Sequence, residues 1–176
     1  MDIEEMLERY EVGERNFAFR VNCSRTGLFM GAVDLSGADI SGINLERAYL
    51  EAAILRNTNL SGANLKGAYM EGIDLTGAIL NGADLSEARG SQANFYDASF
   101  INANLSRVEM YQCAFDGANF SYANLRGAFV NYSFFRGANF SNADLREVEG
   151  FYNIDQAIFS NTIMEDGSIW YDSIGY

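Results

Sequence analysis

Large apolar residues recur at every fifth position through most of this chain. Between Ser41 and Leu65 these centre positions are Leu45, Leu50, Leu55, Leu60 and Leu65. Two residues before each centre lies a small or β-branched residue, in this stretch Ile43, Ala48, Ala53, Thr58 and Ala63. The residue between them is often Asn or Asp. The pattern therefore separates two inward positions from one outward position in every five residues.

A period of five fits neither a 3.6-residue helix nor a long strand with a period of two. It fits a very short strand followed by a turn, because alternate strand residues point to the same side. This frame continues without slippage from Val33 to Glu147, which is 23 pentapeptides. The pattern predicts a stack of short strands joined by corners.

The identities of the centre residues give the number of pentapeptides in each coil. Phe occupies centres in two series with a step of 20, which are Phe95, Phe115, Phe135 and Phe100, Phe120, Phe140. A third series is Leu throughout, and each of its residues follows Asn or Asp: Leu45, Leu65, Leu85, Leu105, Leu125, Leu145. Four pentapeptides therefore form one coil, and the sequence predicts an all-β, four-sided parallel β-helix.

Glycine and methionine support this coil length. Gly90 occupies a centre position and leaves a hole in the core, and Met70 and Met110 lie one coil before and after it. Methionine is flexible enough to fill such gaps. Glycines such as Gly62 recur two residues after a centre, where a type II turn needs a positive φ. Proline, which would remove a hydrogen bond between coils, is absent.

Both ends depart from the regular frame, within what we expect to be one domain, 1–176. We expect a capping helix within 1–15, an irregular first coil in 16–32, regular repeats over 33–147, and an irregular last coil with a C-terminal cap in 148–176. Gly150 and Asp155 would be centres but cannot form a core. A five-residue step resumes at Phe159, Met164 and Ile169.

Segments such as GANLK (62–66) and GADLS (82–86) resemble the repeat A(N/D)LXX of the pentapeptide-repeat family. The resemblance covers about two thirds of the chain and implies a right-handed β-helix. The segments EEMLERYEVGERNF (4–17) and NTIMEDGSI (161–169) are similar to the ends of cyanobacterial members, the heterocyst-inhibiting member among them. That similarity implies a cytoplasmic regulatory protein that acts through protein contacts.

The composition argues against an enzyme. The chain has no His, and carboxylates before a centre, such as Asp74 and Asp84, should be solvated on flat walls without a pocket. Cys113 occupies an inward position, and Cys23 should also be buried, so we predict neither a metal site nor a cofactor. The acidic N-terminus lacks a signal sequence, and no apolar run is long enough for a membrane span, which favours the cytoplasm.

Net charge raises a second function, inhibition of DNA gyrase or another DNA-binding enzyme by DNA mimicry. The chain has a net charge of −12, but the repeat body 33–147 has 13 acidic and 8 basic residues, a net of −5. B-DNA carries about one charge per ~1.7 Å, so a body about 28 Å long would need a charge of about −16. Direct binding of nucleic acid is disfavoured by the same negative charge.

The fourth series of outward positions is unusual, because it carries large side chains instead of Asn and Asp. The candidate binding residues are Tyr49, Tyr69, Arg89, Glu109 and Phe129, with Tyr111 and Tyr132 beside them and Phe134 around the next corner. Glu51 and Glu71 also lie beside this series. Tyr, Phe and Arg concentrate at protein interfaces. The sequence therefore favours a non-catalytic module that binds a protein, either a second copy or a different partner. The alternatives are DNA mimicry and a structural or stress-related protein without a tight partner.

Overall fold

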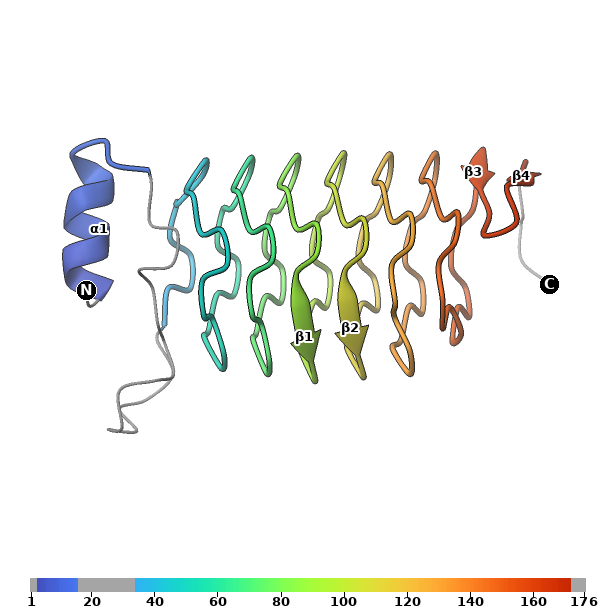
Figure 1. Ribbon diagram of the computed structural model, residues 1–176, viewed down its shortest axis with the longest axis horizontal. Coiled ribbons are helices and arrows are strands. Elements are labelled where there is room, and N and C mark those ends of the chain that lie inside the picture. The colour runs from blue at the N-terminus through green and yellow to red at the C-terminus, as the bar shows by residue number, and fades with distance from the viewer. Residues whose placement is uncertain (1–2, 16–33, 172–176) are drawn as a thin grey trace.

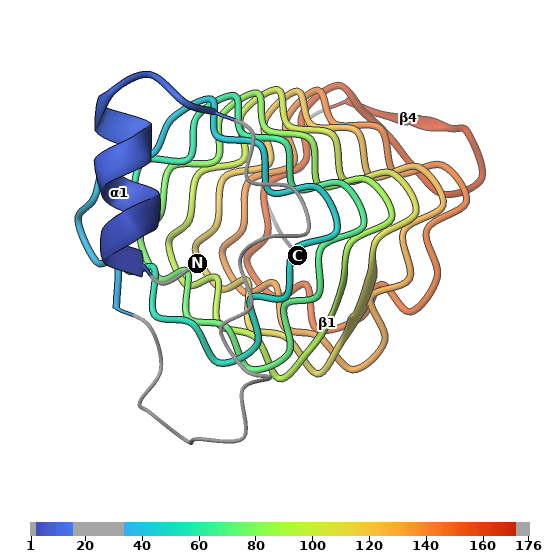
Figure 2. The same ribbon diagram turned by 60° about the vertical axis from the view of Figure 1, so that its left-hand side comes forward.

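The computed structural model describes residues 3–15 and 34–171 (Figure 1). Several predictions fall outside these residues: the irregular coil in 16–32, the burial of Cys23, and the participation of Tyr176 in the C-terminal cap. Within the described part, a helix lies at one end and a long stack of coils forms the rest (Figures 1 and 2).

The stack is built by parallel pairing between residues that are 20 positions apart. Bridges join Asp34 to Ile54, Asn44 to Asn64, and so on along the body at four positions per coil. The 20-residue step and the four walls predicted from the sequence are confirmed. We number the walls by their first outward residues: the first begins at Asp34, the second at Asp39, the third at Asn44 and the fourth at Tyr49.

The named elements are few because most strand segments are single bridges. Helix α1 is Ile3–Glu11, and strands β1 (Arg89–Ser91) and β2 (Glu109–Tyr111) pair in parallel on the fourth wall. Strands β3 (Thr162–Ile163) and β4 (Ile169–Trp170) pair antiparallel at the C-terminal end. Figure 1 shows this order from α1 to β4 along the stack.

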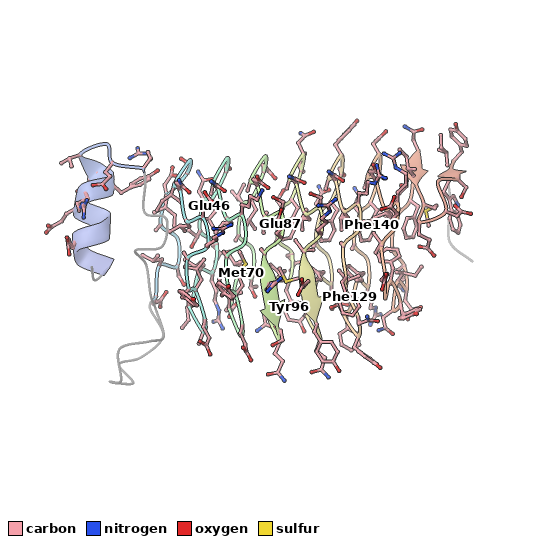
Figure 3. All side chains as sticks on the ribbon, viewed as in Figure 1. Glu46, Met70, Glu87, Tyr96, Phe129 and Phe140 are labelled. Atoms are coloured by element: carbon pink, nitrogen blue, oxygen red, sulfur yellow. The ribbon has the colours of Figure 1, made fainter. Side chains whose placement is uncertain are left out.

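The core consists of the centre residues and the small residues two positions before them. The two Phe series form continuous stacks, with ring centroids 4.7 Å apart for Phe95 and Phe115 and 4.8 Å apart for Phe100 and Phe120. Met70 and Phe140 are fully buried, whereas Phe129, at an outward position, is exposed (Figure 3). Each coil therefore buries one narrow layer against the next.

The corners have the predicted conformation at the second residue after each centre. Gly62 has a φ of 66° there, and non-glycine residues adopt the same region, such as Asn57 with a φ of 55°. The turn is closed by hydrogen bonds such as the one from the Ala63 N–H to the Leu60 carbonyl, at 3.0 Å. Glycine is therefore favoured at the corners but not required.

The predicted hole at Gly90 is filled from one side. The Sδ atom of Met110 lies 3.2 Å from the point that a Cβ on Gly90 would occupy, so this methionine takes up the missing volume. Met70 approaches the same point through its backbone carbonyl, at 3.1 Å. The expectation about Met110 is confirmed, while the side chain of Met70 is not among the atoms nearest to the hole.

Helix α1 is attached to the first described coil. The Tyr10 hydroxyl donates a hydrogen bond to the Ser41 carbonyl at 2.6 Å, and the Asn44 N–H donates to the Arg15 carbonyl at 2.5 Å. The Arg15 guanidinium also lies 3.7 Å from the centroid of the Tyr10 ring. These contacts attach the helix to the N-terminal end of the described stack.

The C-terminal end departs from the frame by one residue. The Val130 N–H donates to the Glu149 carbonyl, but the Phe135 N–H donates to the Asn153 carbonyl, one residue earlier than the 20-residue step requires. Ile154 therefore takes the centre position expected at Asp155. Phe151 also packs against the core, with its ring centroid 5.2 Å from that of Phe135.

One expectation about the last coil is wrong. Phe159 is buried and Met164 is half-buried, but Ile169 is 46% exposed and is not a core residue. The chain reverses between β3 and β4, which pair antiparallel. Trp170 then stacks on Phe159 with ring centroids 5.6 Å apart and covers the end of the Phe column.

Candidate functional site

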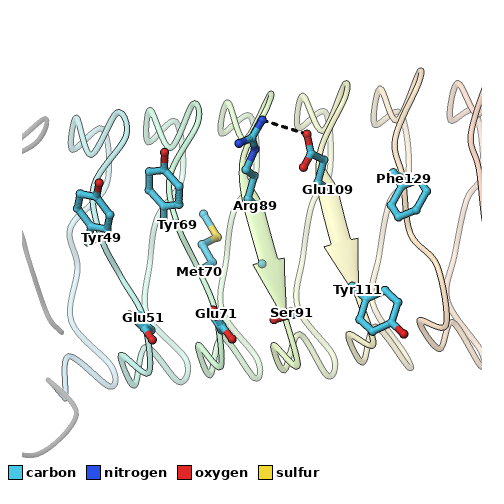
Figure 4. Close-up of a pocket in the computed structure, with 11 residues that line it drawn as sticks. Tyr49, Glu51, Tyr69, Met70, Glu71, Arg89, Ser91, Glu109, Tyr111 and Phe129 are labelled. Atoms are coloured by element: carbon cyan, nitrogen blue, oxygen red, sulfur yellow. Dashed lines mark hydrogen bonds and ion pairs between the residues drawn. The ribbon is translucent and has the colours of Figure 1, made fainter. Parts of the chain in front are cut away.

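The fourth wall presents a shallow groove rather than the flat surface expected from the sequence. It has a volume of about 410 Å³ and lies over β1 and β2 and the two coils before them (Figure 4). The residues that line it are Tyr49, Glu51, Tyr69, Met70, Glu71, Arg89, Gly90, Ser91, Glu109, Tyr111 and Phe129.

Two rows of side chains form the groove. One row contains the outward residues of the wall, Tyr49 to Phe129, and the other contains the residue after each centre (Figure 4). In the second row Ser91 lies between Glu71 and Tyr111, one coil away from each. Because serine is much smaller than its neighbours in this row, the surface is hollow at Ser91.

The outward row has aromatic residues at its two ends and an ion pair in the middle. The rings of Tyr49 and Tyr69 stack with centroids 4.7 Å apart and an interplanar angle of 6°. The Arg89 guanidinium donates a hydrogen bond to the Glu109 carboxylate at 3.1 Å (Figure 4). Both of these charged side chains are more than half exposed, so the pair adds little to stability.

The structure brings six of the eight candidate residues together and leaves two beside the groove. Those that line it are Tyr49, Tyr69, Arg89, Glu109, Tyr111 and Phe129. Tyr132 lies outside, where its ring contacts Tyr111 with centroids 5.3 Å apart. Phe134 lies around the corner on the first wall, bridged to Ala114, and is 51% exposed.

Glu51, Glu71 and Ser91 also line the groove. The sequence placed Glu51 and Glu71 beside the candidate residues, whereas it did not single out Ser91. The signal that identifies them is the series with a step of 20 one residue after the fourth-wall centres: Glu51, Glu71, Ser91, Tyr111. The candidate Tyr111 belongs to this same series, and Glu51 and Glu71 precede it by three and two coils. Their approach to the wall depends on how each corner turns.

Elsewhere, the expectation that Asp74 is solvated is wrong. Asp74 is only 9% exposed, and its carboxylate accepts hydrogen bonds from Arg56 Nε at 2.6 Å and from the Thr76 N–H at 3.1 Å. Burial raises the pKa of this carboxyl, but the hydrogen bonds from Thr76 and Arg56 outweigh it and leave the pKa below its usual value. Asp74 is therefore an ionised structural group.

The cysteine at an inward position is also structural. Cys113 is a free, fully buried thiol, and burial raises its pKa to about 11. Such a thiol stays protonated and is a poor nucleophile.

In the described ranges, 3–15 and 34–171, no group of three or more His, Cys, Asp or Glu residues could hold a metal ion. No helix in those ranges is long and apolar enough to cross a membrane.

Comparison with protein families gives one clear match. The model described as pentapeptide repeats matches in eight copies, over residues 30–67, 53–89, 68–107, 93–131 and 118–149. These ranges contain the whole groove. A comparison with curated proteins finds no match to this chain.

Several solved structures are similar to this chain. Rfr23, a pentapeptide-repeat protein from the cyanobacterium Cyanothece 51142, is 25% identical over 74% of this chain and 90% of its own, with a TM-score of 0.44. HetL from Nostoc sp. strain PCC 7120, a pentapeptide-repeat protein involved in regulating heterocyst differentiation, is 23% identical over 97% and 100%, with a TM-score of 0.27. QnrB1, a plasmid-mediated fluoroquinolone resistance protein, is 20% identical over 78% and 84%, with a TM-score of 0.41.

Proposed function

The chain belongs to the pentapeptide-repeat family, and from this premise we propose that it is a non-catalytic module that binds a protein partner through its fourth wall. The observation that supports this proposal is the groove, whose lining combines aromatic rings with charged side chains. The solenoid that presents it is proposed to be right-handed, as in the family it resembles.

The exposed aromatic residues of the body concentrate around this groove. Tyr69, Tyr111, Phe129, Tyr132 and Phe134 are between 39% and 62% exposed. Monomeric proteins rarely leave large aromatic side chains grouped on one surface without a use. Tyr and Phe are also enriched where proteins bind each other, because they bury a large area with little loss of side-chain entropy.

DNA mimicry receives less support from the arrangement of charge. Four acidic residues of the body form ion pairs with basic residues on or beside the third and fourth walls: Glu87 with Lys66, Glu109 with Arg89, Glu147 with Arg126, and Asp144 with Arg146. Cations are therefore interleaved with the carboxylates along the stack. A mimic of DNA needs a continuous negative stripe, since the duplex carries phosphates without interruption.

The proposed role is regulatory and cytoplasmic, as the resemblance to cyanobacterial members implies. The partner is a different protein in the leading version of the proposal, and a homodimer in the alternative version. The single domain 1–176 and its division into caps and repeats remain predictions.

Affinity capture from a cyanobacterial lysate tests this function. The wild type is compared with a triple variant, Tyr111→Lys, Phe129→Lys, Phe134→Lys, which places charge on the aromatic surface. A control variant, Tyr96→Lys, Tyr122→Lys, Tyr152→Lys, makes the same change at exposed aromatic residues elsewhere. We expect a partner that the wild type and the control retain and that the triple variant loses.

Two results would contradict the proposal. Equal capture of all proteins by the wild type and the triple variant would exclude the fourth wall as the binding surface. Capture of gyrase by both would instead favour DNA mimicry. Circular dichroism spectra of all three proteins must coincide, so that a loss of binding is not a loss of fold.

A further inference from the structure

The groove has an acidic half and an apolar half. Glu51 and Glu71 lie on the same two coils as the stacked tyrosines, in the other row, and Tyr111 and Phe129 lie toward the opposite end, with Ser91 between them (Figure 4). The carboxylates and the apolar rings are therefore separated along the stack instead of being mixed over the whole groove. The separation indicates a ligand with two different side chains at a fixed spacing.

The acidic half has the chemistry that binds a cation. The side chains of Glu51 and Glu71 are exposed and form no ion pair within the described part of the chain, whereas Glu109 is already paired with Arg89. Tyr49 covers one face of the Tyr69 ring, and no arginine of the described residues stacks on Tyr69. A carboxylate beside an aromatic ring stabilises a guanidinium or ammonium group by ion pairing and by a cation–π contact.

The backbone of this wall cannot take part in binding. The Tyr69 N–H donates to the Ala48 carbonyl at 2.9 Å, and the Tyr69 carbonyl accepts from the Leu50 N–H at 2.8 Å. On the next coil, the Arg89 N–H and carbonyl are paired in the same way with Ala68 and Met70. Because these groups are used between coils, a partner cannot add a strand to the wall. Recognition must occur through side chains.

The spacing of the two halves selects the conformation of the ligand. Glu71 and Tyr111 are two coils apart in the same row, which corresponds to about 9.6 Å along the stack. In a polyproline II helix, side chains three residues apart lie on the same side and about 9.3 Å apart. In a β-strand, side chains on one side repeat every ~6.7 Å, so neither two nor four residues match the groove.

We propose that the groove binds an extended, polyproline II-like segment of the partner protein. In this segment an arginine or lysine contacts Glu71 and Tyr69, and a large apolar residue three positions away contacts Tyr111 and Phe129. The main chain between them crosses the hollow at Ser91. This inference rests on the proposed function, and it specifies the chemistry of the partner.

Peptide binding to the purified full chain tests the inference. The probe is a fluorescein-labelled, proline-rich decapeptide with one arginine and one leucine three residues apart, measured by fluorescence anisotropy. Two comparison peptides replace the arginine with glutamate or shorten the spacing to two residues. We expect the first peptide to bind at least about tenfold more tightly than either comparison, and its affinity to fall as salt is raised.

Substitutions in the groove define where the peptide binds. Glu71→Gln should weaken binding about tenfold, because it removes the charge that faces the arginine. Ser91→Tyr should abolish binding, because the new ring fills the hollow and continues the ring of Tyr111 along the row. Asp97→Asn removes a charge at a corner away from the fourth wall, as Glu71→Gln does on it, and should bind as the wild type does. Ser121→Tyr adds a ring after the centre of another wall, as Ser91→Tyr does on the fourth, and should also bind as the wild type does.

The inference is overturned if the glutamate peptide binds as tightly as the arginine peptide, or if Ser91→Tyr binds unchanged. A concentration-dependent dimer in sedimentation that Ser91→Tyr disrupts would also overturn it, in favour of a second copy of the chain. If the arginine peptide does not bind although the triple variant loses its captured partner, this inference fails and the proposed function stands. If the triple variant captures every partner, the proposed function fails whatever the peptides show.

Discussion

The third and fourth walls use their outward positions in opposite ways. On the third wall every outward side chain is Asn or Asp, and each accepts a hydrogen bond from the backbone N–H two residues later, at 2.9 to 3.2 Å. Adjacent coils are also joined through these side chains, as when Asn104 donates to Asp84 at 3.0 Å. The third wall is therefore stabilised by its own surface.

The fourth wall has no side chain of this kind at its outward positions. Arg and Phe side chains have no acceptor atom, and the oxygens of Tyr and Glu lie too far from the backbone to accept a hydrogen bond from their own corner. These side chains contact one another or solvent instead. The comparison teaches that a corner of this solenoid forms without the Asn or Asp contact. The outward residues of one wall are consequently available for binding.

The largest expected effect is a loss of folding stability when core residues behind these two walls are shortened. Met110→Ala should lower the free energy of unfolding by about 2–5 kcal/mol, and by more than Leu105→Ala, the matched change behind the third wall. Both side chains are buried, but Met110 also fills the space that Gly90 leaves empty. Urea denaturation measures both values. An equal or smaller loss for Met110→Ala would show that Gly90 creates no shared cavity.

A smaller difference in stability is expected between substitutions of outward residues on the third wall and on the fourth wall. Asn104→Ala should cost about 1–2 kcal/mol, because it removes hydrogen bonds with the Ser106 N–H, Asp84 and Asn124. Glu109→Ala on the fourth wall should change stability by less than about 0.5 kcal/mol, since its ion pair is exposed. Similar losses in thermal or urea denaturation would remove the distinction between the walls.

The smallest effect concerns pH on the third wall. The Arg146 guanidinium, hydrogen bonded to Asp144, holds the pKa of that carboxyl below its ordinary value. The resulting stability is present above the unfolded pKa of about 3.9 and is lost as the pH falls through the lowered, folded pKa. Asp144→Asn keeps an oxygen for the Arg146 N–H but removes this charge.

We therefore expect the wild type to be more stable than Asp144→Asn by less than about 1 kcal/mol near pH 7, with the difference shrinking below about pH 4. Melting temperatures measured from pH 2 to 7 give the comparison. A difference that is constant over this range would mean that the Arg146 contact does not affect folding through the Asp144 charge.

Much of the fold was predictable because the same inward and outward pattern repeats in every coil. The series Phe95, Phe115, Phe135 identified the 20-residue step, and Gly90 identified the gap that Met110 fills. The errors concern residues whose environment is set by other coils. Asp74 was expected to be solvated, but Arg56 from the preceding coil covers it. Ile169 was expected to be buried, but it follows a reversal of the chain.

The candidate site was predictable only as a list of unusual outward residues. The sequence by itself determined which side chains point away from the core, since that follows from strand alternation and a fixed period. The sequence also placed Phe134 around the next corner, as the structure confirms. The tertiary structure decided that the fourth wall is hollowed into a groove that Glu71, Ser91 and Tyr111 line together. The depth of a surface depends on the sizes of side chains 20 residues apart and on the path of each corner, and both become defined only when the coils are stacked.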